Sequence, residues 1–125
     1  MMNVPLLVAG ALAVGTGIIH IYLMERYYRL LRPDDLPNTR LGSGAAFKSL
    51  LRGISALWGV SWWSAAALFF IFADGTLGGD AETTVRVLAS TFALYAVVIL
   101  ARFGFRHRGG FALAAIAIAA WGGTL

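Results

Sequence analysis

The placement of basic residues around four uncharged apolar segments constrains this chain more than any other feature. Nine of its ten Lys and Arg residues lie in two connections, one between the first and second apolar segments and one between the third and fourth. They are Arg26, Arg29, Arg32, Arg40, Lys48 and Arg52 in the first connection, and Arg102, Arg106 and Arg108 in the second. Short loops rich in Lys and Arg stay on the cytoplasmic side of a membrane, whereas acidic loops are translocated. We therefore predict that loops 26–52 and 102–109 are cytoplasmic and that both termini face outward.

The composition agrees with a membrane protein. Of the 125 residues, 59% are hydrophobic and 13% are charged, whereas a soluble domain has about 25% charged residues. A transmembrane helix takes about 20 residues, so four spans use most of the chain. We predict an all-α fold with a single transmembrane domain, 1–125, built as an up-down bundle of four transmembrane helices in the bacterial inner (cytoplasmic) membrane. The expected helices are 4–30, 45–73, 83–103 and 110–125.

Local signals set the expected ends of these helices. The basic cluster follows the first apolar segment and does not precede it, which favours a retained anchor over a cleaved secretory leader. Ser43 is expected to cap the second helix, and Asp80 or Thr83 the third. The fourth segment is the shortest, so it spans a bilayer only with local thinning or support from a neighbour.

Small residues recur at helical spacing and predict where the helices approach one another. One stripe is Ala9, Ala13 and Gly17 in the first helix, another is Ala115, Ala119 and Gly123 in the fourth, and a third set is Gly53, Ser55, Ala56 and Gly59 in the second. Helix packing in lipid depends on close backbone approach rather than on apolar burial. We expect these three faces to meet.

The run from Trp58 to Ser64 is the most unusual local feature. Trp62 and Trp63 lie about 14 Å along the second helix from Gly53, which is near the bilayer midplane rather than in the interfacial belts that Trp prefers. An indole N–H in lipid needs an acceptor, and Ser61, Ser64 or a facing carbonyl is expected to supply one. The two side chains point about 100° apart around the helix, so they cannot face the same neighbour. They either fill a gap between helices or contact a partner chain or a bound molecule.

His20 lies near the end of the first span and is the other candidate. A neutral imidazole there can ligate a metal or macrocycle, or hydrogen-bond across helices, and the second use is the more common one. His107 stands between two arginines in the inner turn and is a poor second axial ligand for a haem. None of the six acidic residues lies within the four uncharged apolar segments, and no catalytic triad or metal motif is present. We predict no catalytic residue and no metal site.

Six residues carry a family resemblance: Gly17, His20, Glu25, Arg52, Trp58 and Trp62. In this pattern the first two helices resemble a group of small bacterial four-span membrane proteins that have no established activity. In that group a Gly precedes the Glu and a His follows the first Trp, whereas Met24 and Gly59 occupy those places here. The resemblance implies a four-span fold and supplies no reaction.

Two functional hypotheses follow from the sequence. The favoured one is a non-catalytic accessory or structural subunit that packs laterally against other membrane protein subunits of a larger inner-membrane complex, of the electron-transfer or photosynthetic type. The alternative is a protein that binds a hydrophobic cofactor or lipid, such as a quinone, chlorin or haem, as a carrier or a redox enzyme. The residues expected to line that site are His20, Tyr22, Trp58, Trp62 and Trp63. The basic loops are expected to bind anionic lipid headgroups rather than nucleic acid.

Overall fold

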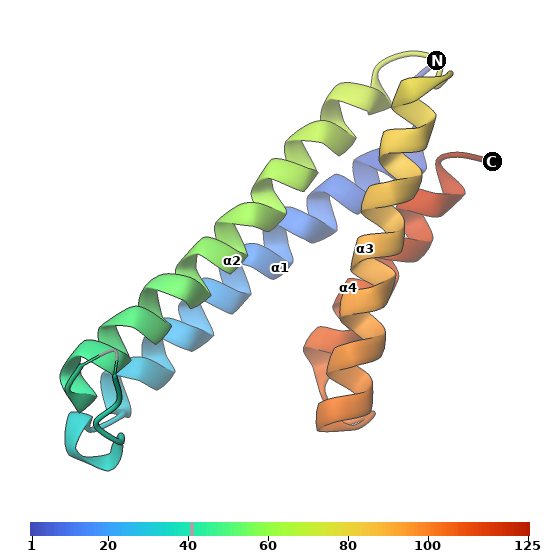
Figure 1. The fold of residues 1–125 in the computed structure, drawn as a ribbon. Coiled ribbons are helices and arrows are strands. Elements are labelled where there is room, and N and C mark those ends of the chain that lie inside the picture. Colours follow the sequence, from blue (N-terminus) through green and yellow to red (C-terminus); the bar gives the residue numbers. More distant parts are fainter. Residues whose placement is uncertain (41) are drawn as a thin grey trace.

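Helices make up most of the structure, a computed structural model that describes residues 1–40 and 42–125. Within those residues the chain forms four α-helices, α1 (Val4–Leu30), α2 (Gly44–Ala73), α3 (Asp80–Phe103) and α4 (Arg108–Gly122), and a 3-10 turn, η1 (Pro33–Asp35) (Figure 1). By length and hydropathy, α1, α2 and α3 are candidate membrane spans, and α4 is a shorter apolar helix. The chain is therefore an all-α, multi-pass membrane protein, as predicted. The helix limits lie within three residues of the expected ones.

The helix ends show which capping predictions were correct. The Ser43 hydroxyl oxygen accepts a hydrogen bond from the backbone N–H of Ala46, so the predicted cap of α2 is confirmed. The prediction for α3 was wrong, because its N-cap residue is Gly79 and no side chain caps it. Gly79 has a φ of +54°, a backbone conformation that glycine adopts without steric cost. Asp80 is instead the first helical residue, where its negative charge interacts favourably with the positive end of the helix dipole.

The four helices form two antiparallel hairpins that spread apart like the arms of a V. Helices α1 and α2 pack along most of their length, as do α3 and α4, while α1 also packs on α4 (Figure 1). The hairpins converge at the end of the molecule that holds both chain termini, which we call the terminal end. They diverge towards the connection after α1 and the turn between α3 and α4, which we call the loop end (Figure 1).

Backbone and side-chain hydrogen bonds hold the terminal end together. The Asn3 backbone N–H donates to the Ala73 carbonyl at 2.8 Å, which joins the start of α1 to the end of α2. The Asn3 side-chain amide donates to the Gly123 carbonyl at 2.7 Å, while its side-chain oxygen accepts from the Leu6 N–H. One asparagine thus caps α1 and links it to the end of α4.

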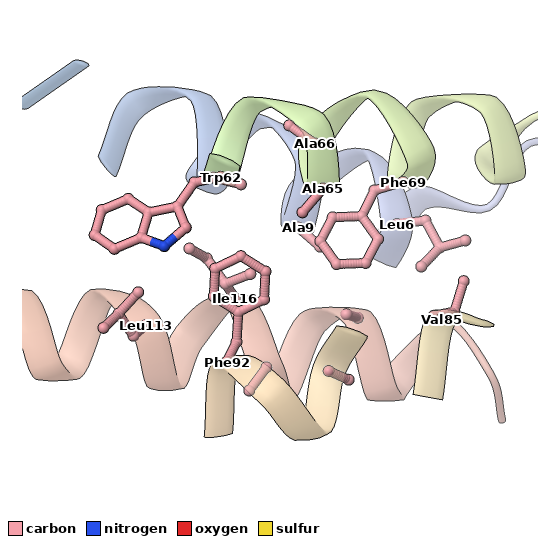
Figure 2. Packing of buried hydrophobic residues seen from close by; sticks show 14 of the residues in the cluster. Leu6, Ala9, Trp62, Ala65, Ala66, Phe69, Val85, Phe92, Leu113 and Ile116 are labelled. Atoms are coloured by element: carbon pink, nitrogen blue, oxygen red, sulfur yellow. The ribbon is translucent and has the colours of Figure 1, made fainter. Parts of the chain in front are cut away.

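The buried core lies mostly where the hairpins converge, as Figure 2 shows. Alanines bring the backbones close, and a few large side chains fill the space between them. The buried residues include Leu6, Ala9 and Ala13 of α1, Ala65, Ala66 and Phe69 of α2, Val85, Ala89 and Phe92 of α3, and Ile116 and Ala120 of α4.

The predicted small-residue contacts are correct for α1 and only partly correct for the other helices. Ala9, Ala13 and Gly17 are buried, and Gly17 lies against Gly59. Helix α4 instead buries Leu113, Ile116, Ala117 and Ala120, while Ala115 is exposed. The reason is that α4 packs on both α1 and α3, and large side chains are needed to fill the space between three helices. Gly53 and Ala56 of α2 are likewise exposed.

Candidate functional site

His20 of α1 and Trp62 of α2 form a polar aromatic pair close to the point where the hairpins separate. Their ring centroids are 5.0 Å apart. The His20 Nε2 atom lies 3.2 Å from the backbone carbonyl oxygen of Ser55. A carbonyl only accepts, so Nε2 carries the proton and, in the neutral ring, Nδ1 keeps the lone pair. His20 is thus a hydrogen-bonded histidine between two helices, and its Nδ1 is the nitrogen left to accept or to ligate.

The Trp62 side chain is buried, yet its indole nitrogen has no hydrogen-bond partner in the part of the chain that the structure describes. Figure 2 shows the nitrogen directed towards α4, near Leu113 and Ile116, which offer no acceptor. Neither Ser61 nor Ser64 accepts from it, and the Ser61 hydroxyl donates to the Trp58 carbonyl instead. Leaving a buried donor unsatisfied costs about 1–3 kcal/mol. This donor is the strongest indication of binding chemistry within the helices.

Trp63 has a different role, as its direction around the helix predicted. Its indole nitrogen donates to the Val14 carbonyl at 3.2 Å, so a facing carbonyl satisfies this ring. The same ring covers Gly17, where a Cβ would lie 2.5 Å from Trp63 Nε1. Trp63 therefore joins α1 to α2 and does not lie with the His20–Trp62 pair.

Trp58 is half-exposed and lies one turn from Trp62 on the same side of α2. Its ring packs against Tyr95 of α3, with centroids 5.3 Å apart, and this contact bridges the two hairpins. Tyr22 is 65% exposed on α1. Among the five residues predicted from the sequence, the structure brings His20 and Trp62 into contact, places Trp58 beside them and leaves Tyr22 apart.

Three residues near this pair were not anticipated: Ser55, Tyr28 and Tyr95. The Tyr28 hydroxyl lies 3.1 Å from the Ser55 hydroxyl, and the Ser55 backbone carbonyl accepts from His20. Tyr28, Ser55 and His20 therefore form a polar group between α1 and α2. Tyr28 is eight residues after His20 and hence on the same helix face, a spacing that could have revealed it. Tyr95 is the only tyrosine in the third apolar segment, a weaker signal.

Charged residues continue this α1–α2 contact towards the loop end. The Glu25 carboxylate accepts from Arg29, one turn away, at 3.4 Å. It also accepts from Arg52 of α2, with the Nε atom at 2.8 Å. Lys48 donates to the Leu31 carbonyl at 2.8 Å. These contacts are exposed or partly exposed and join helices rather than form a reaction centre.

The arrangement offers an unpaired donor, a histidine lone pair and aromatic surface, and the described residues contain no group of three or more potential metal ligands. It can therefore bind an uncharged molecule through a hydrogen bond and ring contacts. The family resemblance noted from the sequence stays a prediction. Comparisons with models of protein families, with curated proteins and with solved structures found no match.

Proposed function

We propose that this chain binds a hydrophobic molecule with an accepting oxygen, such as a quinone, between its two hairpins next to Trp62. The unpaired indole N–H of Trp62 is the observation that carries this proposal. In an apolar surrounding a donor gains most from an acceptor that brings no charge, and a quinone carbonyl is such an acceptor.

The proposed site is reached from the loop end. The hairpins diverge towards that end, and Leu113, which lies on α4 facing the Trp62 ring, belongs to the part of α4 nearest that end (Figures 1 and 2). The contacts that hold α3 and α4 against α1 and α2 concentrate at the terminal end. A small outward movement of α4 at Leu113 therefore exposes the indole nitrogen without disturbing most of the core.

The geometry favours a quinone over a haem or chlorin. His20 uses Nε2 for the Ser55 carbonyl, and Trp62 covers one side of its ring. A macrocycle needs free space above a ligating nitrogen, whereas a quinone carbonyl needs only an N–H within hydrogen-bond distance. Trp58 and Tyr95 add aromatic faces on which a flat ring can stack.

The proposal includes a membrane orientation. All four helices span the bacterial inner membrane in alternating directions, with the loop end in the cytoplasm and both termini outside. Two observations support this orientation: both basic connections lie at the loop end, and both termini lie at the other (Figure 1). The single cysteine variants Arg106→Cys and Gly78→Cys test it, because the native chain has no cysteine. An impermeant thiol reagent applied to intact cells should label the second and spare the first, and the opposite pattern refutes the orientation.

The accessory-subunit hypothesis rests on exposed apolar faces, and such faces do not distinguish contact with another subunit from contact with lipid. Leu57, Ile71 and Ile118 are each more than 60% uncovered by the chain itself. Lipid covers such side chains as well as another subunit does, because acyl chains are equally apolar. The accessory-subunit hypothesis therefore stays a prediction.

Equilibrium dialysis of the detergent-purified protein against a short-chain ubiquinone tests the binding proposal. Trp62→Phe removes the donor and keeps an aromatic ring, and should weaken binding about tenfold, the effect of one hydrogen bond together with its desolvation. Trp63→Phe is the matched control, because it removes the neighbouring indole nitrogen, which already has a partner. Equal losses in the two variants, or no quinone bound by the native protein, would overturn the proposal. Stoichiometric subunits that copurify with a protein unable to bind quinone would favour the accessory hypothesis instead.

A further inference from the structure

A second site lies at the terminal end, on the surface formed by α3 and the end of α4. The structure has a groove there of about 510 Å³. Its lining runs along α3 from Thr83 and Arg86 to Leu94, and Val87, Ser90, Thr91 and Trp121 of α4 also line it. The groove is separate from the His20–Trp62 pair, and none of its residues belongs to the site described above.

Arg86 is held in place at this groove by three contacts. Its guanidinium pairs with Glu82, one turn earlier on α3, at 2.6 Å. Its Nε atom donates to the Thr124 hydroxyl at 3.3 Å, and its Cζ atom lies 5.9 Å from the centroid of the Trp121 ring. A guanidinium has five N–H donors, so several remain for a further acceptor. The Arg86 and Glu82 side chains are 46% and 33% exposed, which leaves both charges accessible.

The order of chemical groups along α3 is what identifies a ligand. Starting from the helix N-terminus, the chain presents the Glu82 carboxylate, the Arg86 guanidinium, the Ser90 hydroxyl and then the apolar Leu94, at successive turns. The Ser90 hydroxyl makes no hydrogen bond to any residue that the structure describes. A phospholipid with an ethanolamine headgroup presents an ammonium, a phosphate, ester oxygens and an acyl chain in the same order.

We propose that this groove binds a zwitterionic phospholipid of the phosphatidylethanolamine class. The phosphate lies against Arg86, the ammonium against Glu82, an ester oxygen near Ser90 and an acyl chain over Val87 and Leu94. The match needs both charges in this order, so it selects among headgroups. Phosphatidylglycerol supplies the phosphate but no ammonium, so Glu82 keeps Arg86 as its cation and gains no second one from the lipid.

The headgroup preference can be measured by native mass spectrometry of the purified protein in detergent. Phosphatidylethanolamine and phosphatidylglycerol with identical acyl chains are added in equal amounts, and the bound fractions are compared. One partly exposed ion pair corresponds to a factor of about five in affinity, so the native protein should retain the ethanolamine lipid about fivefold better. Glu82→Gln should abolish this preference, and Arg86→Gln should weaken the binding of both lipids. Arg102→Gln removes a cation at the other end of the same helix, outside the groove, and is the control that should leave retention of the ethanolamine lipid unchanged.

A second variant tests the acyl part without altering any charge. Leu94→Trp places a large ring in the groove and should reduce retention of the ethanolamine lipid several-fold. Val97→Trp adds the same ring at an equally exposed position of α3 that does not line the groove, and should leave retention unchanged. Equal retention of the two lipids by the native protein, or a preference that persists in Glu82→Gln, would overturn the proposal. Equal effects of the two tryptophan substitutions would overturn it as well.

Discussion

Replacing Gly17 with Ala tests the closest approach between α1 and α2. A Cβ at this position would lie 2.5 Å from Trp63 Nε1 and 3.1 Å from the Gly59 carbonyl oxygen. The first distance is shorter than any ordinary contact, so the Trp63 ring must move. The ring is fixed by its hydrogen bond to the Val14 carbonyl, which such a movement would break.

The expected loss of stability follows from three contributions. Overpacking at a close contact costs about 1–3 kcal/mol, and the lost hydrogen bond costs about 1 kcal/mol. Alanine favours a helix interior over glycine by about 1 kcal/mol, which offsets one of these. The free energy of unfolding of Gly17→Ala should therefore fall by about 1–3 kcal/mol.

Gly15→Ala is the matched control, because it lies two residues earlier on the same helix. A Cβ there would have no neighbour within 4 Å. Gly15→Ala therefore gains the preference of alanine over glycine in a helix interior without a clash, and it should raise the free energy of unfolding by up to about 1 kcal/mol. Unfolding by sodium dodecyl sulfate in mixed micelles, followed by far-ultraviolet circular dichroism, measures both variants. If the two differ by less than about 0.5 kcal/mol, the size of a neutral surface substitution, then the helices do not meet at Gly17.

Three other substitutions test separate parts of the fold. Asn3→Asp keeps the cap of α1 and removes the donor to Gly123, so its thermal unfolding temperature should lie between those of the native protein and Asn3→Ala; a temperature equal to that of the native protein would contradict the link to Gly123. Glu25→Gln should weaken the Arg52 contact, with a loss of stability that is larger in low salt than in high salt; a loss independent of salt would contradict an electrostatic origin. Gly110→Ala would place a Cβ 2.6 Å from the Leu100 side chain of α3. It should therefore destabilise the α3–α4 hairpin by about 1–2 kcal/mol in the same detergent titration, and an unchanged midpoint would contradict that packing.

The helices and their limits could be predicted because charge, glycine and proline mark where apolar segments end. The different directions of Trp62 and Trp63 could also be predicted, since adjacent residues on a helix point about 100° apart. The Trp63 indole N–H donates to the Val14 carbonyl, whereas the Trp62 indole N–H has no acceptor among the described residues. Helix geometry gives the direction of a side chain, and only the packing of other helices decides what it meets.

The buried face of α4 could not be predicted for a related reason. Ala and Gly occur on several sides of this helix, so small residues alone do not distinguish the side that packs. The hairpin divergence is also absent from the sequence pattern, because it depends on how far apart the side chains of two hairpins hold their backbones. Tyr95 was missed for this reason, since its partner Trp58 comes from the other hairpin.

The divergence has a physical cause that also explains where the candidate site lies. At the terminal end, the buried core contains Ala9 and Ala13 of α1 and Ala65 and Ala66 of α2, and small side chains let the helices approach. Towards the loop end, Trp62 lies about one turn from Ala65 and Ala66, and His20 about two turns from Ala13. We infer that these two rings in contact, in place of alanines, keep α1 and α2 from closing on α4. In lipid no apolar driving force closes such a gap, because acyl chains fill it at little cost. The pair that lies where the hairpins begin to separate thus carries both the unpaired indole donor and a histidine nitrogen, and a movement of α4 at Leu113 would give an acceptor-bearing molecule access to that donor.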